Sequence, residues 1–70
     1  MTYLVIEIQK TGDTVGNIVT AYTNRNEAES KYYAVLSAAA VSSVEKHACS
    51  LLTEDGASIR NEAYEHVPEE

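Results

Sequence analysis

The sequence has 70 residues and a formal net charge of −6, from eleven acidic and five basic side chains. A chain this short makes one domain at most and buries only about 60% of the surface that it exposes when unfolded. Its Lys and Arg residues are scattered and outnumbered, which argues against binding of duplex nucleic acid through clustered cations.

Cys49 is the only cysteine. It excludes an internal disulfide and a cysteine-based zinc site, and a lone thiol fits a reducing cytoplasm. Because small domains with marginal cores need additional stabilisation, oligomerisation is the expected source. The N-terminal stretch has no basic leader, and the Ala-rich stretch is too short for the about 20 apolar residues that cross a bilayer. We therefore expect no membrane association.

The first elements along the chain are two strands. Residues 2–9, "TYLVIEIQ", are rich in β-branched and aromatic side chains and predict a strand whose strongly apolar face carries Leu4, Ile6 and Ile8. The turn residues of "KTGDTVG" follow, and then a second predicted strand at 17–23. The short connection predicts an antiparallel hairpin.

A helix is predicted next. In "TNRNEAE", Asn24 can cap the first turn, with Glu27 three residues later in a box-like arrangement, and Thr23 is an alternative cap. The helix is expected to run to about residues 40–42, where no glycine ends it.

A second hairpin is predicted from two strand-like runs, residues 44–52 and 57–66, that flank "TEDG". With a three-residue loop and Gly56 left-handed, Cys49 is expected opposite Asn61 and Leu51 opposite Ile59. One face then carries His47, Cys49, Leu51, Ile59 and Ala63. The other carries Lys46, Ser50, Arg60, Glu62 and Tyr64.

The predicted fold class is α+β, with the order β-β-α-β-β: a four-stranded antiparallel sheet with one helix packed on one face. Residues 1–66 form the single expected domain, and 67–70 form an expected frayed acidic tail. Since one helix covers one face only, further cover is expected to be needed for a second set of side chains: Val5, Val19, Ala21 and Tyr64.

The helix itself has two apolar faces. The face expected on the sheet carries Ala28, Tyr32, Val35, Leu36 and Ala39. The opposite side has small side chains where charges would suit water, which predicts an interface with a second copy. The expected interface residues are Tyr33, Ala34, Ser37, Ala38 and Val41. Alanine is also the best helix former, which would account for an exposed face without any partner.

No catalytic residue, metal site or cofactor is predicted. His47 and Cys49 lie two apart on a strand, about 6.6 Å at the backbone, without a third group to orient a base. Cys49 is expected to be a small buried hydrophobe, and His47 and His66 lack metal-ligand spacing. The predicted ligand-binding set is Lys46, Arg60 and Tyr64, expected on the face away from the helix, where two cations and a ring suit a phosphate and a base. An ordinary solvated sheet face with Glu62 as counter-charge is the alternative.

Several segments, most distinctively "NRNEAESKYYAVLSAAAVS", resemble short proteins encoded in phages and prophages of gut Firmicutes. The resemblance spans nearly the whole chain and implies a mobile genetic context and a location in the cytoplasm of a bacterial host. It favours a non-enzymatic, homo-oligomeric counter-defence protein that sequesters a host immune nucleotide signal. An acidic inhibitor of a basic host protein, such as a nuclease or CRISPR effector, and a minor phage structural or assembly protein are the alternatives.

Overall fold

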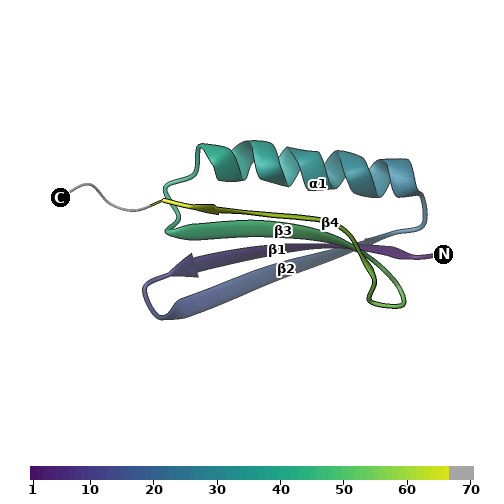
Figure 1. Ribbon diagram of the computed structural model, residues 1–70, viewed down its shortest axis with the longest axis horizontal. Coiled ribbons are helices and arrows are strands. Elements are labelled where there is room, and N and C mark those ends of the chain that lie inside the picture. Colours follow the sequence, from purple (N-terminus) through teal and green to yellow (C-terminus); the bar gives the residue numbers. More distant parts are fainter. Residues whose placement is uncertain (67–70) are drawn as a thin grey trace.

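The computed structural model describes residues 1–66 and contains one sheet and one helix (Figure 1). Along the chain the elements are β1 (Tyr3–Thr11), β2 (Thr14–Tyr22), α1 (Arg25–Ala40), β3 (Lys46–Thr53) and β4 (Ser58–Glu65). All neighbouring strands are antiparallel, in the order β2-β1-β3-β4. The predicted α+β class and element order are therefore confirmed. The expected C-terminal tail, residues 67–70, lies outside the described residues.

The first hairpin is tighter than predicted. Thr11 pairs with Thr14, so the connection has two residues, Gly12 and Asp13. Gly12 has φ +60°, and a glycine at positive φ in the first loop position suits a type II′ turn, whose twist matches that of the strands. Both strands consequently reach nine residues.

The helix begins as predicted at an Asn24 cap. The Asn24 side-chain oxygen accepts hydrogen bonds from the backbone N–H groups of Asn26 (2.8 Å) and Glu27 (3.3 Å). These bonds satisfy two of the donors that a helix start leaves free, and Thr23 is not the cap. The helix ends at Ala40, with Val41 as its C-cap, within the expected range.

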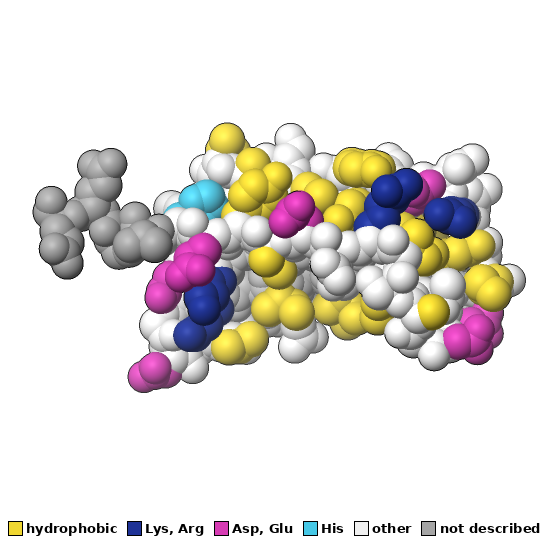
Figure 2. All heavy atoms as spheres, viewed as in Figure 1, with side chains coloured by type: hydrophobic (Ala, Val, Ile, Leu, Met, Phe, Trp, Pro, Cys, Tyr) yellow, Lys and Arg dark blue, Asp and Glu magenta, His cyan; other side chains and the backbone are white. Residues whose placement is uncertain are grey.

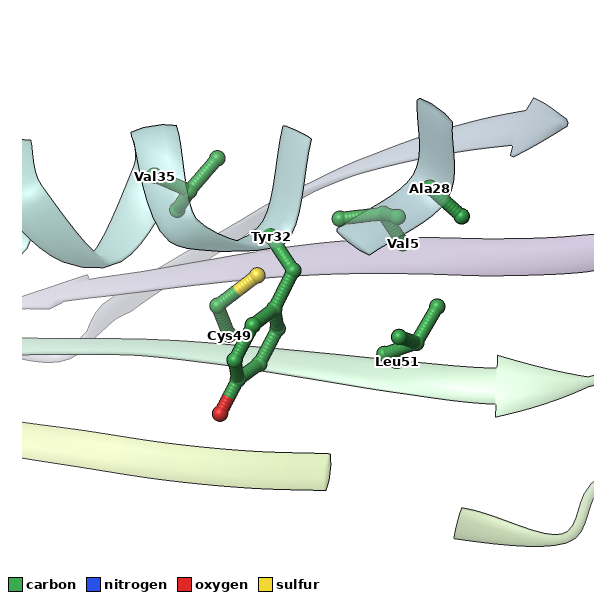
Figure 3. Close-up of a cluster of buried hydrophobic side chains, with 6 residues drawn as sticks. All are labelled: Val5, Ala28, Tyr32, Val35, Cys49 and Leu51. Carbon is green, nitrogen blue, oxygen red and sulfur yellow. The ribbon is translucent and has the colours of Figure 1, made fainter. Parts of the chain in front are cut away.

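The core lies between α1 and the sheet (Figure 3). Its helix residues come from the predicted stripe, with Ala28, Tyr32, Val35 and Ala39 buried. The sheet contributes Val5, Cys49 and Leu51. Val5 therefore lies under the helix, which corrects the expectation that it would need other cover. Leu4, Ile6 and Ile8, the more apolar alternate residues of β1, point the other way.

The second hairpin has the predicted loop but a different register. Gly56 has φ +86°, and Thr53 N–H donates to the Ala57 carbonyl at 2.9 Å, which closes a three-residue loop. Leu52 then pairs with Ser58, but Leu51 pairs with Arg60, because a bulge leaves Ile59 without an opposite residue. Since side chains alternate along a strand, one extra residue reverses the face of everything after it.

This bulge overturns the predicted faces of β4. Cys49 lies opposite Glu62 rather than Asn61, and His47 lies opposite Tyr64 rather than Ala63. Arg60, Glu62 and Tyr64 consequently belong to the helix side of the sheet, together with His47, Cys49 and Leu51. Tyr64 needs no cover on the far side, contrary to expectation.

No element covers the other side of the sheet, the open face, within residues 1–66 (Figure 1). The registers place a set of apolar side chains there, of which Ile8, Val15 and Val19 are the most exposed. Leu4, Ile6 and Leu52 are half-buried on the same face. The larger part of the aliphatic surface of this sheet thus lies away from the helix.

Candidate functional site

A hollow of about 560 Å³ lies between α1 and β4, and we call it the α1–β4 hollow. In Figure 2, apolar, basic and acidic side chains lie next to one another along this boundary. Tyr33 and Leu36 line it from the helix, and Arg60, Glu62 and Tyr64 line it from the strand. The hollow exists because the helix crosses mainly over β3 and β1, and because the bulge directs these β4 side chains toward the helix.

Arg60 is the cation of this hollow. Its Nε donates to Glu29 Oε1 at 2.8 Å, and its guanidinium carbon lies 5.8 Å from the centroid of the Tyr33 ring. The hydrogen bond to Glu29 raises the already high pKa of Arg60 further, so the group is charged at any physiological pH. Because Glu29 accepts from Nε, the two terminal NH₂ groups are not committed to that contact.

Aromatic rings form much of the wall. Tyr32 and Tyr33 meet edge to face, with centroids 5.3 Å apart, and Tyr33 is 51% exposed. Tyr64 stacks on His66 at 6.5 Å. His66 is fixed in turn, because its Nε2 donates to the carbonyl of Ala39 at the end of the helix (2.9 Å). The Tyr64 ring thus stacks on a residue that follows β4 and is hydrogen-bonded to α1.

The structure divides the predicted ligand-binding set. Arg60 and Tyr64 line the same hollow on the helix side. Lys46 lies on the open face, opposite Lys10 on β1 and Glu65 on β4. Lys46 therefore cannot share a small ligand with Arg60 and Tyr64, and the prediction that all three lie on the face away from the helix is wrong. Sequence reasoning missed Tyr33 as their neighbour because it had been placed in an interface.

A second polar cluster lies on the helix side of the sheet, around the buried His47 and the half-buried Glu7 and Gln9. His47 Nε2 and Glu7 Oε2 lie 2.5 Å apart, and Gln9 Nε2 donates to the same carboxylate oxygen at 2.9 Å. Burial alone would raise the pKa of Glu7, but the hydrogen bonds from His47 and Gln9 lower it below its ordinary value. These three side chains come from β1 and β3, and the pairing of the two strands brings them together.

Cys49 lies opposite Glu7 in this register, which places a thiol beside the His47–Glu7 pair. The side chain is 1% exposed, as expected for a small buried hydrophobe. Burial, with the neighbouring charge of Glu7, raises the pKa of the Cys49 thiol to about 11. A nucleophilic cysteine requires the opposite shift, toward the thiolate. The geometry therefore supports a packing role for this residue.

The five residues of the predicted helix interface, Tyr33, Ala34, Ser37, Ala38 and Val41, are all exposed. Tyr33 also belongs to the α1–β4 hollow. Within residues 1–66, no group of three or more His, Cys, Asp or Glu side chains is arranged to hold a metal ion. Among the same residues, no helix is long and apolar enough to cross a membrane.

Residues 1–66 form a small two-layer α+β domain, and the α1–β4 hollow is its open, polar and aromatic recess. No protein-family model matches the chain, and neither a curated protein nor a solved structure matches it.

Proposed function

We propose that this chain is a non-enzymatic binding protein that takes a nucleotide-type ligand into the α1–β4 hollow. The observation that carries the proposal is the position of Arg60, whose guanidinium lies over the Tyr33 ring and which lines the same hollow as Tyr64. A base can stack on an exposed tyrosine ring, a contact worth about 1–3 kcal/mol. The terminal NH₂ groups of Arg60 suit one phosphate through two parallel hydrogen bonds.

The charge of the hollow limits the ligand. Arg60 and Glu62 are the charged side chains that line it, and Glu29 pairs with Arg60 from outside the lining, so the hollow has no net positive charge. Such a wall suits a ligand with one or two phosphate charges better than a triphosphate. The resemblance to phage and prophage proteins supports sequestration of a host immune nucleotide signal, in the cytoplasm of the host, as the biological form of this binding.

Titration calorimetry with linear and cyclic mono- and dinucleotides tests the proposal, with inorganic phosphate as the ligand control. We expect Arg60→Ala to weaken binding at least about tenfold, since it removes the charged donor that would hold the phosphate. Lys46→Ala is the matched control, because it removes one cation from the opposite face. Its affinity should stay within about twofold of wild type.

The bound ligand is then released by heating and compared with the starting compound by chromatography. Intact ligand agrees with sequestration, whereas a converted product would mean that the chain is an enzyme. The proposal is refuted if no nucleotide binds more tightly than about 1 mM, or if Lys46→Ala weakens binding as much as Arg60→Ala.

The acidic surface favours a second candidate function, inhibition of a basic host protein. The chain carries a net charge of −6, and Glu54 and Asp55 are exposed at the tip of the β3–β4 loop. Negative charge steers a protein toward the basic channel of a nuclease or CRISPR effector. Salt-sensitive inhibition of such an enzyme by the pure protein, reduced by Asp55→Asn, would favour this function over ligand sequestration.

A further inference from the structure

The two edges of the sheet differ in how they are protected against pairing with another strand. Edge strand β4 carries the charged residues Arg60, Glu62 and Glu65 and begins with a bulge. Charges and bulges are the features with which edge strands avoid association. Edge strand β2, "TVGNIVTAY", has nine residues with no charge and no proline. A long uncharged edge is a template for another strand.

The backbone of β2 has hydrogen-bonding groups to offer. In a hairpin with a two-residue turn, the pair that flanks the turn exchanges both hydrogen bonds, and such pairs alternate along the strands. Thr11 and Thr14 are that pair. The residues between these pairs, beginning with Val15, therefore direct their N–H and C=O groups away from β1. These residues are Val15, Asn17, Val19 and Ala21.

The side chains of β2 are also uncovered on the helix side. Ile18 lies on that side and is 56% exposed, because α1 packs mainly over β3 and β1. A second hollow, of about 180 Å³, adjoins it and is lined by Glu7, Gln9, Gly16, Asn17 and Ile18. This edge thus offers backbone groups and an aliphatic side chain beside an unfilled space.

From these observations we propose that β2 pairs with β2 of a second copy, antiparallel about a twofold axis. Antiparallel pairing centred on Ile18 puts Val15 opposite Ala21 of the second copy and Asn17 opposite its Val19, which gives about eight backbone hydrogen bonds. The two Ile18 side chains then meet on the axis. The result is one continuous eight-stranded sheet with both helices on the same side.

The distribution of charge favours a second copy of the chain as the partner of the β2 edge. Each chain has a net charge of −6, and β2 is a region without acidic side chains where two copies repel each other least. Asp13 precedes β2 and Arg25 follows it. Antiparallel pairing brings Asp13 of one copy toward Arg25 of the other at both ends, and Arg25 is only loosely held by Glu29 at 3.7 Å.

The dimer differs from the helix-to-helix dimer that the small side chains of α1 suggest, and it does not depend on ligand binding. The α1–β4 hollow lies at the opposite edge of each sheet from β2. Each copy therefore keeps a complete hollow. Failure of nucleotide binding would leave this inference intact, and a monomeric protein could still bind a nucleotide.

Sedimentation velocity between micromolar and millimolar concentration tests the proposal through the mass of the wild-type particle, expected to be twice the 7.7 kDa of one chain. Ile18→Lys should weaken dimerisation at least tenfold. The matched control is Ile8→Lys, the same substitution on the open face of central strand β1, which should leave the dimer unchanged. A third variant, Ala38→Glu on the exposed helix face, should also leave it unchanged.

Amide hydrogen exchange of the wild-type protein tests the same pairing without any substitution. In the dimer the outward amides of Val15, Asn17 and Val19 should exchange slowly, and dilution to monomer should accelerate them. If Ile18→Lys fails to fold by circular dichroism, Asn17→Pro replaces it, since proline removes an outward N–H and no ladder bond. The proposal is overturned if the protein is a monomer at all concentrations or if these amides exchange fast in the dimer. It is also overturned if Ile8→Lys or Ala38→Glu abolishes the dimer while Ile18→Lys keeps it.

Discussion

Two adjacent leucines of β3 test which face of the sheet is the core. Leu51 is fully buried under α1, with 0% exposure, and Leu52 is half-buried on the open face, opposite Leu4. Removing a fully buried leucine side chain costs about 3–4 kcal/mol, because the transfer free energy is lost and a cavity remains. At Leu52 only part of the side chain leaves water, and we expect Leu52→Ala to cost about 1 kcal/mol.

The total stability sets the scale of the effect. At about 0.05–0.15 kcal/mol per residue, a 70-residue domain has a free energy of unfolding of about 4–10 kcal/mol. Leu51→Ala therefore removes a large share of it. With a urea dependence of about 1 kcal/mol per M, the unfolding midpoint should fall by about 3–4 M for Leu51→Ala and about 1 M for Leu52→Ala.

Urea titrations followed by far-ultraviolet circular dichroism, at one protein concentration for all variants, measure these midpoints. Both variants should keep the wild-type spectrum before unfolding. An equal or larger loss in Leu52→Ala would refute the reasoning, because it would mean that the open face holds the tighter packing.

The other predictions concern the half-buried carboxylate of Glu7, the thiol of Cys49 and the helix cap at Asn24. The pKa of Glu7 is lowered, so its contribution to stability is present above pH 4.5 and is lost as the pH falls through the lowered pKa. Glu7→Gln should therefore cost about 1–3 kcal/mol at pH 7, and the variant should lose less stability in acid than the wild type. An unchanged acid dependence of the urea midpoint would contradict this. Because burial raises the pKa of Cys49 to about 11, a disulfide reagent at pH 8 should react with it only after urea unfolds the protein, and rapid reaction of the native chain would count against the burial described. Asn24→Ala should cost about 1 kcal/mol, or about 4–8 °C in melting temperature, whereas Thr23→Ala should cost less; the reverse order would move the cap to Thr23.

The sequence alone determined the local structure. The strands follow from β-branched runs, the helix start from Asn24, and both hairpins from glycines at Gly12 and Gly56, each of which adopts a positive φ. These signals depend on a few neighbouring residues and on backbone sterics, which are the same in any tertiary setting. The order β-β-α-β-β followed from them, and the buried helix stripe followed from the helical spacing of its apolar residues.

Tertiary structure decided which residues meet. The bulge at Ile59 moved Arg60 and Tyr64 to the helix side and left Lys46 on the open face. No local sequence pattern predicted the bulge, since Ile59 opposite Leu51 would be a favourable apolar pair. The register of a strand depends on the packing of its whole face, and a single extra residue moves the side chains that follow it to the opposite face.

Tertiary structure also decided which face of β1 lies under the helix and brought Glu7 and His47 together there. The pattern of Leu4, Ile6 and Ile8 marked the more apolar side, yet the helix covers the side with Val5 and Glu7. Glu7 is acceptable there because His47, 40 residues along the chain, supplies a partner for its carboxylate. A contact at that separation exists only once β1 and β3 are paired, since pairing of distant strands, and not any local propensity, brings the two side chains within hydrogen-bonding distance.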